Sequence, residues 1–146
     1  MKQTEIDLQP VQAAAQPYLS VTDLVVKFPS EDGVVNAVDG VSLSVERGKT
    51  LAIVGESGSG KSVTALAIMG LLDRKSATVT GEVWLDGDEL IDMPQAAVRR
   101  MRGSKMAMIF QDPMSSLHPF YRIGDQLGEA ARVHRSLSKA AARSEA

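Results

Sequence analysis

The stretch Gly55-Glu56-Ser57-Gly58-Ser59-Gly60-Lys61-Ser62 decides the fold, because it matches the pattern G-x-x-x-x-G-K-[ST] in full. Small residues at positions 57–60 let successive backbone N–H groups turn inward and approach a bound anion closely. The apolar run Thr50–Val54 leads into the loop and a helical pattern leads out from Lys61, which is the context that this motif requires. These residues predict a loop that holds the terminal phosphates of a nucleoside triphosphate.

Two side chains of the loop are expected to do specific chemistry. The Lys61 ammonium can reach the β- and γ-phosphates, and the Ser62 hydroxyl can complete a Mg²⁺ shell shared with phosphate oxygens. The helix that begins near Lys61 adds the partial positive charge of its N-terminus. The other expected phosphate-binding positions act through their backbone and are Gly55, Glu56, Ser57, Gly58, Ser59 and Gly60. The alternative, a flexible glycine-serine turn, is opposed by the flanking strand and helix patterns.

Hydrophobic patterning on both sides of the loop predicts an α/β fold. Alternation predicts strands at 19–28, 34–38, 41–45 and 81–85, and the continuous apolar runs at 50–54 and 106–110 predict strands buried on both faces. Helices are expected from 61, from 94 to 102, from 123 to 134 and from 138, where a serine suits the N-cap. Turns are expected at 29–33 and 86–87. Residues 1–17 are predicted to form a loose leader.

Composition excludes several classes of protein. The chain has 146 residues, 44% apolar and 23% charged, which is typical of one ordinary globular domain. A net charge of −2 argues against a protein that coats nucleic acid. The absence of cysteine excludes a disulfide framework, a thiolate metal site and a cysteine nucleophile, and it fits a reducing cytosol. No apolar run approaches the length of about 20 residues that a membrane span needs, and Met1–Gln16 lacks the apolar region of a secretory signal.

A second motif carries a resemblance to a known family. The stretch Ile109–Leu117, IFQDPMSSL, resembles the Q-loop of ABC transporter ATPases. With VGESGSGKS at 54–62 and AVDGVSLSV at 37–45, the chain is similar to the peptide-importer branch, which includes dipeptide, oligopeptide, nickel and glutathione uptake ATPases. The resemblance runs from about Leu19 to the C-terminus. It implies a P-loop NTPase core with an N-terminal antiparallel β subdomain.

The same resemblance divides residues 18–146 into parts. It implies that residues 55–62 are the Walker A motif, that residues 110–119 are the Q-loop, and that residues 120–146 begin a helical subdomain in which the sequence stops. The signature sequence LSGGQ, the acidic strand and the switch histidine of the family follow the Q-loop and are absent from this sequence. We therefore expect the N-terminal part of a nucleotide-binding domain, which binds nucleotide but hydrolyses little or none.

The resemblance also assigns roles to residues outside the loop. It implies that Gln111 is catalytic together with Lys61, as a Mg²⁺ ligand or by positioning the attacking water. It implies that Phe28 stacks on the adenine ring, with Ala37 on the other side of the base. Stacking needs only an aromatic face, so phenylalanine suffices. The alternatives are a solvent-facing glutamine at the end of a strand and a core phenylalanine.

Cofactors and partners are implied by the resemblance in the same way. It implies ATP and Mg²⁺ as cofactors, a second ABC ATPase domain, two transmembrane permease subunits and, indirectly, an extracytoplasmic solute-binding protein. The chain would then act at the cytoplasmic face of the membrane, without nucleic acid. Two alternatives stay open, because the phosphate loop alone does not separate them from transport: a P-loop enzyme such as a small-molecule kinase, and a non-catalytic nucleotide-binding pseudo-subunit.

The remaining charged residues are interpreted as structural. Asp86 follows an apolar strand as a Mg²⁺-binding acid would, but Gly87 after it favours a turn. His118, where the family usually has asparagine, and His134 are expected to be surface residues, since neither has a second ligand at metal spacing. A solvated helix end is expected for the cations Arg99, Arg100, Arg102 and Lys105.

Overall fold

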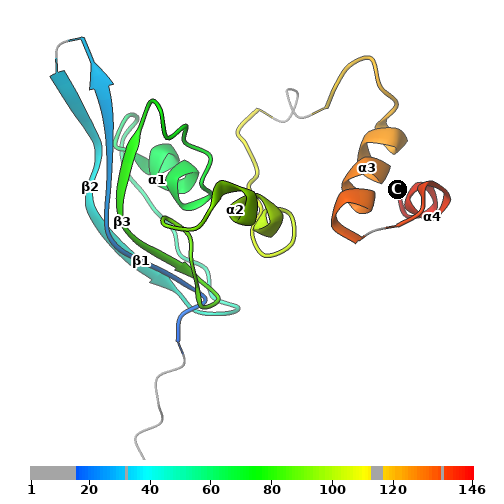
Figure 1. The fold of residues 1–146 in the computed structure, drawn as a ribbon, viewed down its shortest axis with the longest axis horizontal. Helices are drawn as coiled ribbons and strands as arrows, with labels where there is room; N and C mark the ends of the chain where they lie inside the picture. The colour runs from blue at the N-terminus through cyan, green and yellow to red at the C-terminus, as the bar shows by residue number, and fades with distance from the viewer. Residues whose placement is uncertain (1–15, 32, 113–116, 136) are drawn as a thin grey trace, which may run out of the picture.

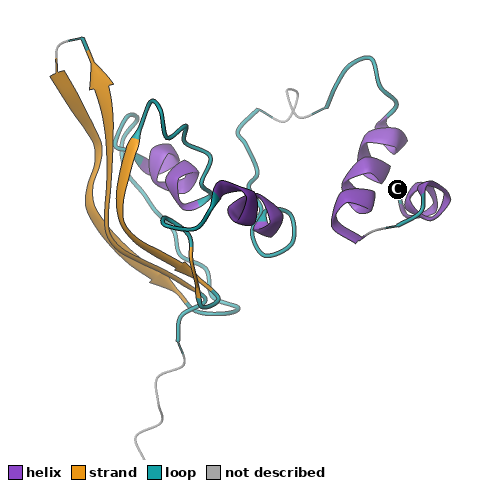
Figure 2. Cartoon of the chain, in the orientation of Figure 1, coloured by secondary structure: helices purple, strands orange, loops and turns teal. Residues whose placement is uncertain are grey.

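A computed structural model of the chain describes residues 16–31, 33–112, 117–135 and 137–146. These residues form one antiparallel sheet in the order β2-β1-β3-β4, with helices α1 and α2 to one side and the pair α3 and α4 beyond them (Figures 1 and 2). The predicted leader falls almost entirely outside the described residues. The elements are β1 (Leu19–Ser30), β2 (Gly33–Val45), α1 (Lys61–Ile68), β3 (Thr78–Leu85), β4 (Asp88–Glu89), α2 (Gln95–Met101), α3 (Ile123–Arg135) and α4 (Lys139–Glu145).

Strand β1 is the centre of the sheet and pairs with β2 along one edge and β3 along the other. The two short strands predicted at 34–38 and 41–45 are one continuous strand, β2, so that prediction was wrong. The polar residues between them do not end the ladder, because a shift in register accommodates them: Val38 pairs with Val26 and Val41 pairs with Leu24. The result is a long β1–β2 hairpin that leads toward the phosphate loop.

The core lies between this sheet and helix α1. Leu24 and Val26 of β1 and Val83 of β3 are fully buried, and they cluster with Ala67 of α1 and Met101 of α2. Burial of this kind stabilises by about 25 cal/mol for each Å² of apolar surface removed from water. The helix that follows the phosphate loop is therefore fixed to the sheet by apolar contacts.

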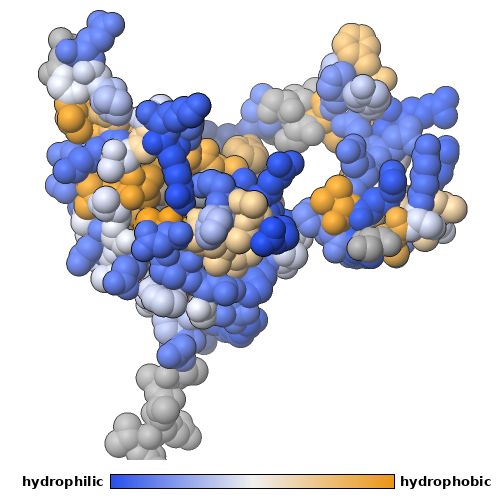
Figure 3. All heavy atoms as spheres, viewed as in Figure 1, coloured by the Kyte–Doolittle hydropathy of each residue, from blue (hydrophilic) through white to orange (hydrophobic). Residues whose placement is uncertain are grey.

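The two apolar runs predicted as buried strands, Thr50–Val54 and Met106–Phe110, are irregular segments outside the sheet. Their side chains are largely open to solvent, with Val54 89% and Ile109 98% exposed. A strand needs a neighbour for its backbone hydrogen bonds, and in the described ranges no strand pairs with either run. On the face drawn in Figure 3, apolar side chains are exposed over the sheet and α1. The runs have the composition of a sheet interior without the neighbouring strands that would bury them.

The helices match their predicted positions closely. Ser138 caps α4, since its Oγ accepts a hydrogen bond from the Ala141 N–H at 3.2 Å. Pro94 is the N-cap of α2, one residue before the helix begins. Within the described part of the chain, no helix combines the length and the apolar character needed to cross a membrane.

Arg102 closes the C-terminal end of α1. Its Nε donates to the Met69 carbonyl oxygen at 2.8 Å, and its Nη2 also donates to the Gly70 carbonyl oxygen. Carbonyl groups at the end of a helix lack partners within the helix, and a cation both pairs with them and complements the helix dipole. The solvated helix end predicted for four cations was therefore wrong for Arg102, which is half-buried. Arg99, Arg100 and Lys105 are exposed as expected, and Lys105 also pairs with a carboxylate.

Replacement of Arg102 tests this contact. Arg102→Met should lower the free energy of unfolding by about 2 kcal/mol, because hydrogen bonds from a charged group contribute roughly 1.5–3 kcal/mol. Urea unfolding followed by circular dichroism measures the change. Arg99→Met, on the exposed side of the same region, is the matched control and should stay within about 0.5 kcal/mol of the unchanged chain. Equal stability of the two variants would contradict the capping role.

Candidate functional site

The phosphate loop joins the irregular segment 50–54 to the first turn of α1. Gly60 is the N-cap of α1, with φ 87° and ψ 0°. Its carbonyl oxygen accepts two hydrogen bonds from Thr64, one from the backbone N–H at 2.8 Å and one from Oγ1 at 3.0 Å. Thr64 is itself buried, so the start of the helix is firmly fixed. The loop residues before Gly60 are exposed, which leaves the loop open to a ligand.

An irregularity in β2 meets the loop at Gly60. The β1–β2 register passes from Val26–Val38 to Lys27–Asn36, which leaves Ala37 without a partner on β1, as in a β-bulge. A Cβ atom at Gly60 would overlap the Ala37 carbonyl oxygen. The two backbones approach this closely only because residue 60 is glycine and adopts a left-handed conformation. No sequence signal marks the bulge, and it fixes the position of the loop against the sheet.

Lys61 is folded back over its own loop. Its Nζ donates to the Gly55 carbonyl oxygen at 2.8 Å, to the Glu56 carbonyl oxygen at 2.5 Å and to Ser59 Oγ at 3.1 Å. All three acceptors are neutral oxygens. Bonds from an ammonium to an anionic oxygen are about twice as strong as neutral ones, so a bound phosphate can take over these contacts. The charge that the motif requires is therefore present in the loop itself.

The remaining predicted site residues are only partly brought together. Ser62 is exposed in the first turn of α1, next to Lys61. Gln111 is also exposed and comes directly after the run 106–110, which no ladder of the described sheet joins to 50–54. The predicted Q-loop is described only in part, because 113–116 lie outside the described residues. In the ranges that the structure covers, no cluster of three or more His, Asp or Glu side chains could hold a metal ion.

Phe28 lies near the end of β1, opposite Val35 on β2. Its side chain is half-buried and packs against the core, which agrees with the alternative of a core phenylalanine. Val35 precedes Ala37 by two residues, and Ala37 contacts the phosphate loop at Gly60. The same hairpin thus carries the aromatic ring and supports the loop, and Phe28 remains a candidate for adenine stacking.

A loop before α3 presents aromatic side chains to solvent. The His118 ring centre lies 4.7 Å from that of Tyr121 and 5.8 Å from that of Phe120. The Gln126 side chain accepts from the His118 N–H at 2.7 Å and donates to the His118 and Tyr121 carbonyl oxygens, each at 3.0 Å. Sequence reasoning missed Gln126, because a single polar residue in a helix pattern gives no signal. Phe120 is 89% exposed and Tyr121 65%, so this loop adds to the apolar surface.

Comparison with known proteins decides the family. Residues 38–145 match the ABC transporter family. The chain belongs to the ABC transporter family. The ABC transporter cassette MJ0796, in its dimeric structure, superposes with a TM-score of 0.73 at 22% identity, over 86% of this chain and 53% of that one. This likeness confirms the predicted ABC ATPase fold with its antiparallel β subdomain.

Curated relatives confirm the peptide-importer branch. The oligopeptide transport ATP-binding protein OppD of Escherichia coli is 45% identical over 131 residues, which are 90% of this chain and 39% of the relative. The dipeptide transport ATP-binding protein DppD of Bacillus subtilis is 50% identical over 87% of this chain and 38% of its own length. The glutathione import ATP-binding protein GsiA of Salmonella typhimurium is 48% identical over 88% of this chain and 22% of its own length. This ABC family chain thus spans less than two fifths of the length of these relatives.

The contact between Gly60 and Ala37 can be tested with two alanine variants. Gly58 and Gly60 both adopt left-handed φ, but only Gly60 has a backbone neighbour in the way of a Cβ atom. Both variants carry the backbone cost of about 1–2 kcal/mol for a side chain in this conformation. Gly60→Ala should lose about 1–3 kcal/mol more, as overpacking does. Thermal or urea unfolding measures the difference, and equal stabilities of Gly58→Ala and Gly60→Ala would refute the contact.

Proposed function

We propose that the chain is the nucleotide-binding part of the ATP-binding subunit of a peptide-type ABC importer. The single observation that carries this proposal is the open loop from Gly55 to Ser62, with the Lys61 ammonium held over it by neutral oxygens. On binding, the ammonium exchanges these oxygens for the β- and γ-phosphate oxygens of ATP. Backbone N–H groups of the loop and the N-terminus of α1 complete the phosphate site. The names of the relatives, which are ATP-binding proteins of oligopeptide transport, dipeptide transport and glutathione import, support the same conclusion.

Mg²⁺ is assigned to Ser62 and Gln111. A hydroxyl and a carboxamide oxygen are both hard oxygen ligands of the kind that Mg²⁺ takes beside phosphate oxygens. Ser62 and Gln111 would hold the ion, which would supply neutralisation of the negative charge on the phosphates. Gln111 lies on a segment outside the described sheet, so its approach to the loop requires that residues 106–110 lie beside 50–54.

Adenine is assigned to the exposed part of Phe28. The ring lies on the hairpin that contacts the loop through Ala37, and stacking recognises the face of the base rather than its hydrogen-bonding edge. Stacking on Phe28 would favour ATP, which has a base, over an inorganic polyphosphate, which has none. Phe28 also packs against the core, so a purely structural role is the alternative to adenine stacking.

The exposed apolar surface and the names of the relatives both support a proposal of partner proteins. A second ABC ATPase domain, permease subunits and an extracytoplasmic solute-binding protein are what an importer subunit works with, and the related cassette MJ0796 was solved as a dimer. In this arrangement the chain acts at the cytoplasmic face of the membrane. The exposed Phe120 and Tyr121, in the loop that opens the proposed helical subdomain, are side chains suited to contact another protein.

Nucleotide binding without turnover is the expected behaviour of the 146-residue chain. Mg·ATP should shift the amide resonances of 55–62 in NMR spectra, because the phosphates contact those N–H groups. Lys61→Ala should weaken binding roughly 10- to 100-fold, since charge-assisted hydrogen bonds contribute about 1.5–3 kcal/mol. ATP hydrolysis should stay at background, because phosphoryl transfer also needs an acidic Mg²⁺ ligand and a water-positioning group that act together.

Lys49→Ala, which removes an exposed lysine from the turn before the loop, is the control and should leave affinity unchanged. A folded chain that shows no shift in 55–62 would refute the phosphate site. Steady ATP turnover that Lys61→Ala abolishes would refute the expected inactivity. Transfer of phosphate to a small molecule in preference to water would support a kinase instead.

Phe28→Leu tests the adenine assignment. Stacking of a base on an aromatic side chain contributes about 1–3 kcal/mol, so ATP affinity should fall roughly 5- to 100-fold. Affinity for inorganic tripolyphosphate, which has no base, should not change. Isothermal titration calorimetry with both ligands makes the comparison, and Phe28→Tyr, which keeps the aromatic face, serves as the control. Equal losses for both ligands would assign Phe28 to the core alone.

A further inference from the structure

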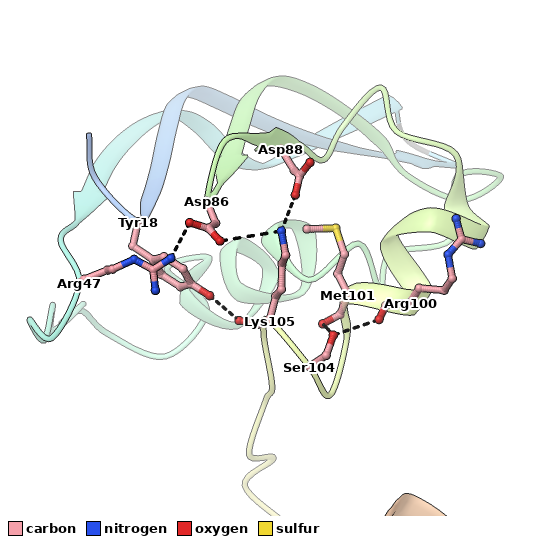
Figure 4. Close-up of polar contacts among 8 residues, drawn as sticks. All are labelled: Tyr18, Arg47, Asp86, Asp88, Arg100, Met101, Ser104 and Lys105. Atoms are coloured by element: carbon pink, nitrogen blue, oxygen red, sulfur yellow. Dashed lines mark hydrogen bonds and ion pairs between the residues drawn. The ribbon is translucent and has the colours of Figure 1, made fainter. Parts of the chain in front are cut away.

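Four separate segments meet beside the start of the run that leads to Gln111 (Figure 4). Lys105, in the loop after α2, is at the centre, with its ammonium 2.7 Å from an Asp88 oxygen and 3.8 Å from an Asp86 oxygen. Asp86 also accepts a hydrogen bond from Arg47 at 2.5 Å. The Arg47 guanidinium carbon lies 4.4 Å from the centre of the Tyr18 ring. We call these five residues the Lys105 network.

The backbone of the Lys105 loop also has hydrogen-bond partners outside the loop. The Tyr18 hydroxyl donates to the Lys105 carbonyl oxygen at 2.9 Å, which ties the loop to the start of the sheet. Ser104 Oγ donates to the carbonyl oxygens of Arg100 and Met101, each at 3.1 Å, which ties the same loop to the end of α2. The chain at Lys105 is therefore fixed both in position and in direction.

The turn between β3 and β4 is built to present Asp86. Asp86 has φ 52° and Gly87 has φ 87°, the conformation of a two-residue hairpin turn, and the Asp86 N–H donates to the Tyr18 carbonyl oxygen at 2.8 Å. A non-glycine residue keeps a left-handed conformation where its surroundings fix it. Here the surroundings are the cations Arg47 and Lys105, which both pair with the Asp86 carboxylate. This confirms that Asp86 is a turn residue.

The Lys105 ammonium at the centre of the network stays protonated at neutral pH. The hydrogen bond to Asp88 raises the pKa of Lys105, partial desolvation acts against it, and the charges of Asp88 and Asp86 add to the rise. A raised pKa means that the Lys105 ammonium is fully charged below the usual lysine range, about 10.4, and loses its proton only as the pH rises through the higher value. The network is therefore intact across the neutral range.

The segment after Lys105 depends on this anchorage. Residues 106–110 are outside the described sheet, and Gln111 lies six positions beyond Lys105. A chain of that length reaches at most about 20 Å, so a rotation of about 10° at its start would displace its end by roughly 3 Å. Metal–ligand distances tolerate only about 0.2 Å. The direction of the chain at Lys105 thus decides whether Gln111 can meet a metal ion.

We propose that Lys105 is a positioning residue: its pairs with Asp86 and Asp88 set the starting point and direction of residues 106–110, and so the place at which Gln111 meets Mg²⁺. The anchorage stands on the contacts of the network, and its link to Mg²⁺ rests on the proposed function. The sheet thus contacts two parts of the site. It supports the phosphate loop through β2, and it holds the segment that leads to Gln111 through Lys105.

Distance measurement tests the anchorage without any nucleotide. The chain contains no cysteine, so cysteines introduced at Thr80 of β3 and at Ile109, both exposed, carry spin labels at defined sites. Pulsed electron paramagnetic resonance should give a narrow distance distribution for the labelled chain and for Lys105→Arg, which keeps the ion pairs. Lys105→Met should broaden it, and Lys75→Met, at another exposed lysine, should not. An unchanged distribution in Lys105→Met would overturn the anchorage.

Magnesium dependence tests the link to Gln111. ATP affinity is measured with and without Mg²⁺. The ratio of the two affinities gives the enhancement of ATP binding by the metal. Lys105→Met should lose as much of this enhancement as Gln111→Ala does, with Mg²⁺-free affinity unchanged, and Lys105→Arg should retain it. Full enhancement in Lys105→Met would overturn the link. Absence of Mg·ATP binding by the unchanged chain would overturn the proposed function and the link with it, while the distance measurement still decides the anchorage.

Discussion

The close approach of two backbones at Gly60 and Ala37 is the constraint on which the rest of the site depends. One comes from the phosphate loop and the other from an unpaired residue of β2, and a side chain at position 60 would separate them. Through this contact the hairpin supports the loop on one side, while the core holds α1 on the other. The loop is thus set between a sheet and a helix, and the position of any bound phosphate is determined by that of the sheet.

The described residues form a supported half and an unsupported half of one site. The antiparallel sheet buries its own core and orders the phosphate loop, α1 and the Lys105 loop. The apolar runs 50–54 and 106–110 lie beside it without strand partners in the described ranges. Hydrogen bonding therefore determines where the sheet ends, because apolar composition alone does not make a strand. Gln111 follows the second of these runs, so the described sheet does not fix its position relative to the loop.

Local signals predicted much of this arrangement. The glycine-rich loop at 55–60, the helix after it, the Asp86-Gly87 turn and the Ser138 cap each depend on a few neighbouring residues, and the structure has each where it was predicted. The errors concern contacts between distant residues. Whether TLAIV becomes a strand depends on its neighbours, and whether Arg102 is solvated depends on the end of α1, more than thirty residues away. The unpaired residue at Ala37 and the role of Gln126 leave no local signal at all.

The folded-back Lys61 side chain has a consequence for selectivity among anions. Because its ammonium already has three oxygen partners, an entering ion must replace all of them before it gains anything. Free orthophosphate, abundant in cells, offers one compact group and little else to offset that exchange. In the proposed site, a nucleoside triphosphate would add contacts along its phosphate chain and at its base. The resting position of Lys61 would therefore favour long polyanions over short ones.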